Sequence, residues 1–164
     1  MIRIVVMGPS GSGKSLVGAA LASRLRARFV DGDDLHPATN IAKMRAGTPL
    51  DDADRAPWLD AVALTLAGRD ATVVACSALR RSYRDRIRGR VADAVFVELV
   101  VAAEQLHTRM SRREHFMPPE LLDSQLNTLE PLAQDEVGVR VANDADLESV
   151  VDRIVAVLEG QSLR

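Results

Sequence analysis

The chain has 164 residues, of which 47% are hydrophobic, 27% charged and 3% aromatic, and its formal net charge is −2. These fractions exclude a disordered or fibrous protein, and the length suits a single domain over residues 1–164 with one sizeable core. No apolar run approaches the roughly 18 residues that span a membrane, and the mildly acidic balance argues against nonspecific nucleic-acid binding. We therefore expect neither a membrane nor a nucleic-acid partner.

Strand-like and helical patterns alternate along the chain. The expected strands are the apolar runs Ile2–Met7, Phe29–Val30, Thr72–Ala75, Val95–Val101 and Val137–Val141. Between and after them, apolar residues recur at helical spacing within Leu16–Leu25, Leu59–Leu66 and Leu147–Leu158. Glycines stand where helices can end, at Gly47, Gly68, Gly89 and Gly160. Short, valine-rich strands that alternate with helices indicate an α/β domain whose parallel sheet is covered on both faces.

The start of the chain and its cysteine content bear on its location. Met1–Met7 enters a strand-like run at once and lacks the basic region and cleavage site of a secretory signal. Cys76, the single cysteine of the sequence, has no partner for an internal disulfide. We expect it inside the third strand as a small core residue, not as a nucleophile. These features predict a cytoplasmic protein.

The motif G-x-x-x-x-G-K-[ST] follows the first expected strand and opens the first expected helix. It spans residues 8–15, here called the phosphate loop, and its expected nucleotide-binding residues are Gly8, Ser10, Gly11, Ser12, Gly13, Lys14 and Ser15. Glycines let successive backbone N–H groups turn inward around an anion, and the helix N-terminus adds partial positive charge. We expect Lys14 to reach the β- and γ-phosphate oxygens and the Ser15 hydroxyl to bind Mg²⁺.

An aspartate-rich stretch, Asp31–His36, directly follows the second expected strand, on the same rim of the sheet as the phosphate loop. A kinase that phosphorylates a hydroxyl needs a carboxylate that accepts or orients the hydroxyl proton. Asp31 and Asp33 can divide two tasks, one supporting the Mg²⁺–water shell and the other meeting the substrate hydroxyl. The alternative is that residues 31–34 simply form a turn and a helix cap.

These residues and their neighbours resemble the gluconate kinase family over nearly the whole chain. The matching positions after Asp31–His36 are Asn40, Lys43, Met44, Gly47, Pro49, Leu50, Asp54, Arg55 and Pro57–Leu59, then Cys76–Leu79 and Tyr83–Asp85, then His115–Pro118, Leu121, Leu122, Ser124, Gln125 and Thr128–Glu130. The departures from the family's pattern are small, at Pro9, Arg80 and Glu114. Glu114 lies in the lid-like segment and removes no expected ligand.

The resemblance implies transfer of the γ-phosphoryl group of ATP to the 6-hydroxyl of D-gluconate, which gives 6-phospho-D-gluconate and ADP and feeds gluconate into the pentose phosphate pathway. It implies a P-loop kinase fold like that of the shikimate and nucleoside monophosphate kinases, with five parallel strands in the order 2-3-1-4-5, and a homodimer. A substrate-binding insertion then covers residues 31–59, and a lid covers residues 112–128. By the same likeness, Asp33 orients the substrate and acts as general base, Asp31 lies near Mg²⁺, and His115 binds the substrate.

A small anion with many hydroxyls needs a pocket that pairs a cation with polar groups. His36, Arg55 and Arg84 are the candidates, because arginine suits bidentate binding of a carboxylate; the alternatives are surface arginines and a helix-start histidine. We expect Arg109 and Arg113 to close over the phosphates, as the corresponding arginines do in related kinases, with Arg113 at the transferred phosphoryl group and Arg109 near the nucleotide. Basic residues at a helix C-terminus are also favourable without such a role.

Other functions compete with this interpretation. A guanine-specific switch protein would carry an N-K-x-D tetrapeptide, and lysine occurs in this sequence only as Lys14 and Lys43, neither of them in that context. Among kinases, the alternatives are an enzyme for another small polyol acid and a shikimate-type kinase. Trp58 is most simply a packing anchor beneath the substrate segment.

Overall fold

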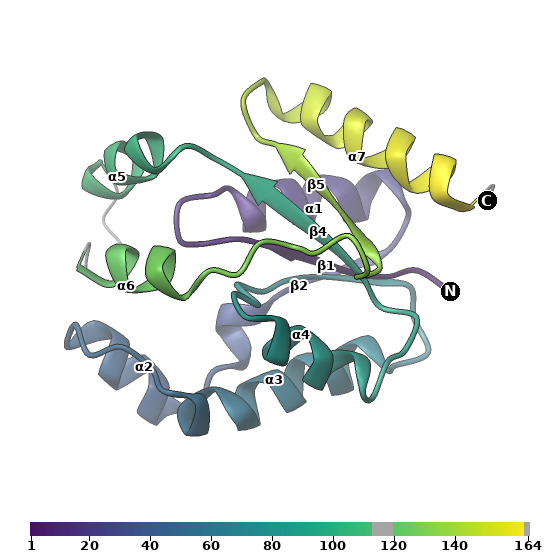
Figure 1. Ribbon diagram of the computed structural model, residues 1–164. Helices are drawn as coiled ribbons and strands as arrows, with labels where there is room; N and C mark the ends of the chain where they lie inside the picture. Colours follow the sequence, from purple (N-terminus) through teal and green to yellow (C-terminus); the bar gives the residue numbers. More distant parts are fainter. Residues whose placement is uncertain (113–119, 163–164) are drawn as a thin grey trace.

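A five-stranded parallel sheet forms the centre of the computed structural model, which describes residues 1–112 and 120–162 (Figure 1). The strands are β1 (Arg3–Met7), β2 (Arg28–Asp31), β3 (Thr72–Ala75), β4 (Val95–Val100) and β5 (Gly138–Ala142). Their order in the sheet is β2-β3-β1-β4-β5, and each pair of neighbours is parallel. This confirms the expected sheet and strand order, with strand bounds that differ from the predicted runs by at most one residue at either end.

Helices cover both faces of the sheet and its carboxyl end. One face is covered by α1 (Lys14–Arg24) and α7 (Leu147–Ser162), and the other by α3 (Asp52–Leu66) and α4 (Arg81–Arg88) (Figure 1). Beyond the strand ends lie the 3₁₀ helix η1 (Gly32–Leu35) and helices α2 (Ala38–Arg45), α5 (Ala103–Ser111) and α6 (Glu120–Thr128). None of the helices in the described ranges is long and apolar enough to cross a membrane.

Alternate residues of β1 build two separate cores. Ile4 and Val6 pack with residues of α1 and α7, whereas Val5 and Met7 pack with residues of α3 and α4. Successive side chains of a strand point to opposite faces, so a sheet covered on both sides needs apolar residues at every position. This is why β1 reads as a continuous apolar run and not as an alternating one.

Three of the four glycines expected at helix ends are confirmed, and the fourth is not. Gly47, Gly68 and Gly89 come one or two positions after the last residues of α2, α3 and α4. Gly160 lies inside α7, so the prediction that a helix ends there is wrong. A Cβ atom at Gly160 would meet nothing within 4 Å. Glycine costs a helix interior only about 1 kcal/mol, and the buried apolar face earlier in α7 outweighs that cost.

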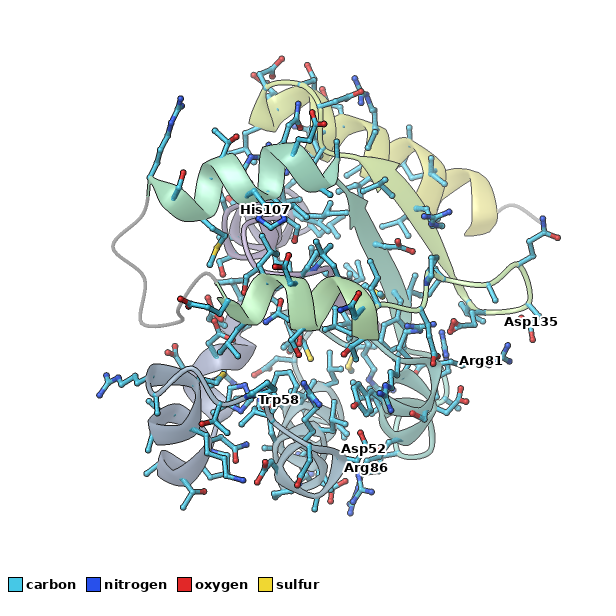
Figure 2. The ribbon with its side chains drawn as sticks, turned by 60° about the vertical axis from the view of Figure 1, so that its left-hand side comes forward. Asp52, Trp58, Arg81, Arg86, His107 and Asp135 are labelled. Carbon is cyan, nitrogen blue, oxygen red and sulfur yellow. The ribbon has the colours of Figure 1, made fainter. Side chains whose placement is uncertain are left out.

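The carboxyl ends of the strands position the candidate site. β1 leads into the phosphate loop, β2 into η1, and β3 into residues 76–79. We expected Cys76 inside the third strand, but it directly follows β3. Its side chain is buried. Burial raises the pKa of its thiol to about 12, so Cys76 is an inert core residue, as predicted. Figure 2 turns this end of the sheet toward the viewer.

Candidate active site

The backbone of the phosphate loop requires glycine at its two ends. Gly8 has φ of 147° and Gly13 has φ of 92°, values that residues with a side chain rarely adopt. A Cβ at Gly8 would lie 2.7 Å from Ser12 Oγ, and one at Gly13 would lie 2.6 Å from Asn143 Nδ2. The chain can therefore curl tightly before α1 begins at Lys14, which is the geometry that gathers backbone N–H groups around an anion.

Side chains from distant parts of the chain hold this loop in place. Asn143, just after β5, donates from Nδ2 to the Ser12 carbonyl oxygen at 2.8 Å. Arg109, near the end of α5, donates from Nη1 to the Gly11 carbonyl oxygen at 2.9 Å. Gln125 of α6 accepts from the Ser10 backbone N–H through Oε1 at 2.7 Å. The loop is thus tied to three elements that approach it from different sides.

Lys14 and Ser15 occupy the first turn of α1 with different partners. Lys14 reaches back across the loop, and its Nζ donates to the Pro9 carbonyl oxygen at 3.0 Å. Ser15 Oγ donates to Asp31 Oδ2 at 2.6 Å. The other oxygen of Asp31, Oδ1, accepts from the Asp33 N–H at 3.0 Å and caps η1. Asp31 therefore caps a helical turn, as the alternative interpretation described, and it also contacts the hydroxyl expected to bind Mg²⁺.

Asp33 lies where two hollows of the surface meet. One is a cleft lined by Ser10, Lys14, Asp33, His36, Arg55 and Trp58 together with residues of α2 and α6. The other runs along the outside of the phosphate loop and is lined by Gly11, Gly13 and Ser15, and it shares Ser10, Lys14 and Asp33 with the first. Residues of the phosphate loop and of the aspartate-rich segment therefore line the same cleft, as the sequence predicted.

His36 and Trp58 form a stacked pair in the wall of the cleft. Their ring centroids are 4.1 Å apart with an interplanar angle of 14°. Trp58 is buried, and its Nε1 donates to the Gly32 carbonyl oxygen at 2.7 Å (Figure 2). Burial and the nearby Arg55 guanidinium lower the pKa of His36 to about 4. Trp58 is thus the expected packing anchor, and it holds both the backbone of η1 and the His36 ring.

A set of polar contacts links His36 to α2 and α3. The buried Asn40 of α2 donates from Nδ2 to the Asp54 carbonyl oxygen at 2.8 Å, and the same nitrogen lies 3.3 Å from His36 Nδ1. Lys43 Nζ lies 2.8 Å from each carboxylate oxygen of Asp54. Asp54 and Asp51 also form a capping box at the start of α3. These contacts fix α2 against α3.

Arg55 lines the cleft but not the hollow beside the phosphate loop. Its Nη1 donates to the Leu50 carbonyl oxygen and, at 3.2 Å, to the Tyr83 hydroxyl. The guanidinium carbon lies 5.4 Å from the centre of the Tyr83 ring. Because Arg55 is half-buried and lines the cleft, it offers a fixed positive charge to a molecule in the cleft.

Comparisons with known proteins identify the family. A model of the AAA domain family matches residues 4–132. A gluconokinase of Gluconobacter oxydans (strain 621H) is 44% identical over 157 residues, covering 93% of this chain and 88% of that protein. The crystal structure of a gluconokinase from Sinorhizobium meliloti 1021 is 46% identical with a TM-score of 0.90, covering 98% of this chain and 93% of that chain. The chain belongs to the gluconokinase family.

A more distant structure shares the fold of this gluconokinase family member. Shikimate kinase from Acinetobacter baumannii in complex with shikimate has a TM-score of 0.66 at 20% identity, covering 100% of this chain and 96% of that chain. This agrees with the shikimate-kinase-like architecture that the resemblance implied.

Arg84 is the candidate that the structure moves away from the site. Its exposed fraction is 0%, and its Nε and Nη2 donate to the Glu136 carboxylate at 2.7 Å each. Its Nη1 donates to the Ala78 carbonyl oxygen at 3.1 Å and to the Glu130 carbonyl oxygen at 3.0 Å. A guanidinium can be buried this deeply only when its charge and its donors are matched. The prediction that Arg84 binds the substrate is therefore corrected, because Arg84 is a structural residue.

The buried partner of Arg84 keeps its negative charge. Burial by itself would raise the pKa of Glu136, but the hydrogen bonds and charge of Arg84, together with the Ala133 N–H and the Arg88 charge, hold that pKa below its usual value. The neighbouring Glu130 is fixed as well, since its N–H donates to the Leu79 carbonyl oxygen at 2.7 Å and its Oε2 accepts from the Arg81 N–H at 2.8 Å. The segment that enters β5 is thus fastened to the residues that follow β3.

Two expected lid residues, Arg113 and His115, lie outside the described residues. On either side of them, α5 and α6 pack through Leu106, Met110 and Leu122. His107 Nε2 also lies 3.2 Å from Asp123 Oδ1, between these two helices (Figure 2). The described parts of the lid region therefore stand over the phosphate loop, where Arg109 and Gln125 contact it.

The sequence analysis missed the roles of Asn143, Gln125 and Asn40. Gln125 and Asn40 were among the positions that matched the family, but nothing in the residues indicated what they contact. Asn143 could have been noticed as a polar residue directly after the fifth strand, at the edge of the sheet where α/β proteins build sites. No local signal pairs it with Ser12, which lies 131 positions away.

Proposed function

We propose that this protein transfers the γ-phosphoryl group of ATP to the 6-hydroxyl of D-gluconate, giving 6-phospho-D-gluconate and ADP. The observation on which the proposal rests is that Lys14 and Asp33 line the same cleft, which His36 and Arg55 also line. A phosphate-binding cation and a carboxylate therefore flank the region where an acceptor hydroxyl would meet a phosphoryl donor. Membership of the gluconokinase family supports gluconate as the acceptor.

At the nucleotide end, the loop's backbone N–H groups and the N-terminus of α1 would hold the phosphates of ATP. Lys14 would exchange its contact with the Pro9 carbonyl for the β- and γ-phosphate oxygens and stabilise the charge that develops during transfer. Arg109 already lies against the loop, which suits a role beside the nucleotide. Arg113 remains our candidate for the transferred phosphoryl group.

The residues near Asp31 fit a magnesium ion bound jointly with the nucleotide. The described residues contain no group of three or more histidine, cysteine, aspartate or glutamate side chains that would bind a metal by themselves. The pair of Ser15 Oγ and Asp31 Oδ2 supplies oxygen atoms, and Mg²⁺ in kinases takes few protein ligands and completes its shell with phosphate and water oxygens. When bound, Mg²⁺ would neutralise and orient the phosphates. Ser15 would hold it, and Asp31 would orient its water shell.

At the acceptor end, Asp33 would accept the proton of the 6-hydroxyl and orient that hydroxyl toward the phosphoryl group. The substrate carboxylate and the remaining hydroxyls would contact Arg55 and His36, with His115 of the lid as a further candidate. Asp33 lines both the cleft and the hollow beside the phosphate loop, whereas Arg55 lines only the cleft, so the arrangement suits an acid whose anionic group lies away from the reacting hydroxyl.

Cytoplasmic location and a homodimer belong to the same proposal. The lone buried Cys76 suits a reducing compartment, and the family resemblance supports a dimer. Light scattering of the purified full-length protein measures the assembly directly, and a monomer at working concentration would refute the dimer.

The reaction is tested by measuring ADP release with Mg²⁺ and a panel of acceptors that includes D-gluconate, other sugar acids, shikimate and nucleoside monophosphates. We expect turnover with D-gluconate far above the rate without acceptor, and a phosphomonoester at the 6-position by phosphorus NMR. Preference for a different acid would correct the substrate, and background turnover with every acceptor would reject a kinase.

A further inference from the structure

The amide of Asn40 has a single possible orientation. Its Nδ2 lies 2.8 Å from the carbonyl oxygen of Asp54, which can only accept a hydrogen bond. An amide oxygen in that place would face another oxygen, so the atom is the nitrogen. That nitrogen has two hydrogens, and it also lies 3.3 Å from His36 Nδ1. One hydrogen therefore serves Asp54 and the other serves the imidazole ring.

This arrangement decides which nitrogen of His36 bears the proton. Nδ1 faces a donor and must offer its lone pair, so the proton of the neutral ring resides on Nε2. A doubly protonated ring would set an N–H group against the N–H of Asn40. The low pKa of His36, caused by burial and by Arg55, agrees with a neutral ring at physiological pH.

The two ring nitrogens also face different surroundings. His36 lines the cleft together with Lys14, Asp33 and Arg55, whereas Asn40 is buried behind it and is not part of the lining. Within the described part of the chain, His36 Nε2 makes no hydrogen bond, and stacking on Trp58 limits rotation of the ring. Nε2–H is thus the donor available to a molecule in the cleft.

We propose that Asn40 is a positioning residue that fixes His36 as a neutral Nε2–H donor to an oxygen atom of the acceptor. This deepens the proposed function and rests on it for the identity of that acceptor. Asn40 itself touches no substrate and acts through the ring. The selectivity that follows is chemical, because His36 and Arg55 both donate, while Asp33 accepts. A molecule in the cleft must then offer oxygen lone pairs to His36 and Arg55 and a hydroxyl hydrogen to Asp33, which a polyhydroxy acid provides.

The position of Asn40 depends in turn on the fixed backbone of Asp54. The Asp54 carboxylate is held by Lys43 and by its capping box with Asp51, so its carbonyl cannot turn away. The hydrogen bond with Lys43 is the main cause that holds the pKa of Asp54 below its usual value, and the pair remains charged near neutrality. A chain of contacts thus runs from Lys43 through Asp54 and Asn40 to His36.

The first test is the protonation pattern of His36 in the full-length protein without ligand, measured by two-bond nitrogen–proton NMR at pH 7. His36→Gln assigns the signals among the three histidines of the sequence. We expect an unprotonated Nδ1 and a protonated Nε2. A proton on Nδ1, or an imidazolium, would overturn the inference. This measurement involves no acceptor, so it stands apart from any failure of gluconate as substrate.

The second test separates positioning from structural support by kinetics. Asn40→Ala should raise KM for D-gluconate about tenfold, the value of one well-placed hydrogen bond, with kcat and KM for ATP changed by less than about twofold. Thr39→Ala, at an exposed neighbour on α2, is the matched control and should change neither constant. If Asn40→Ala raised KM for D-gluconate and KM for ATP by the same factor, Asn40 would only support the fold.

Variants of His36 give the same answer if the buried Asn40→Ala protein does not fold. The side-chain amide of glutamine overlaps Nε2 and can still donate, whereas that of asparagine overlaps Nδ1. We expect His36→Gln to retain a KM for D-gluconate at least about threefold lower than His36→Asn. The reverse order would place the functional nitrogen at Nδ1 and contradict the proposal.

Discussion

The phosphate loop and the acceptor segment, residues 31–55, meet at one cleft but are built differently. The loop offers backbone N–H groups, and its shape follows from glycine dihedral angles within eight consecutive residues. The acceptor segment offers side chains whose positions depend on one another, from Lys43 through Asp54 and Asn40 to His36. Binding by the backbone of the loop therefore depends on a few glycine positions. Binding by the side chains of the acceptor segment can be weakened by a substitution at any residue in the series of contacts.

The largest expected effect tests the loop. Lys14→Ala should lower turnover about a thousandfold, equivalent to about 4 kcal/mol, because no other loop side chain supplies a charge to the transferred phosphoryl group. The fold should survive, since the Lys14 contact with Pro9 is a single hydrogen bond. Lys43→Ala is the control lysine and should act mainly on KM for the acceptor. Near-normal ADP release from Lys14→Ala would refute its phosphate role.

A comparison of two arginines separates stability from binding. Arg84→Met should lower the free energy of unfolding by about 3 kcal/mol, because it leaves the buried Glu136 carboxylate without its main partner. Arg55→Met should instead raise KM for D-gluconate about tenfold with a smaller loss of stability. Urea unfolding and steady-state kinetics measure both. If the Arg84→Met protein were as stable as the unchanged protein and had a raised KM for D-gluconate, Arg84 would be a substrate-binding residue after all.

Asp33→Asn addresses the point where the two regions meet. Loss of a general base should lower kcat about a hundredfold, while ATP binding measured by calorimetry changes little. Asp34→Asn, at the exposed neighbouring carboxylate, is the matched control and should behave like the unchanged protein. If ATP binding collapsed and turnover survived, the catalytic carboxylate would be a different one.

The smallest expected effect is a pH dependence of stability in the acceptor segment. The unfolded histidine takes up a proton near pH 6.5, whereas folded His36 does so only near pH 4. The contribution of the neutral ring is therefore complete above pH 6.5 and is lost as pH falls toward 4, by about 1 to 2 kcal/mol after allowance for solvent screening. His36→Gln should flatten this part of the curve relative to the unchanged protein. An unaltered slope would contradict the low pKa.

The fold could be predicted because its signals are local. The strands are buried on both faces, so β3 reads as an unbroken apolar run whose bounds match the prediction at both ends. The strand order came from the family resemblance and was confirmed. Gly160 misled the analysis because an exposed glycine costs a helix less than its packed face contributes, and packing is not visible in a local pattern.

The site was predictable where its residues lie in one motif, and not where it depends on distant pairs. Lys14 and Ser15 belong to the motif that follows β1 and Asp33 to the segment that follows β2, and the structure places all three around one hollow, as expected. In the sequence, Arg55 and Arg84 were equal candidates for binding the substrate. Only their burial in the structure distinguishes them, because Arg84 is fully buried and Arg55 lines the cleft. Glu136, which decides the role of Arg84, lies 52 positions away and shares no motif with it.

The contacts of Glu130 anchor one end of α6. Its backbone and side chain are hydrogen-bonded to Leu79, Arg81 and Arg84, just beyond the carboxyl end of α6. Near the other end of the helix, Leu121 packs on Met44 and Leu50 of the acceptor segment. Helix α6 therefore links the residues that follow β3 to the acceptor segment along one wall of the cleft.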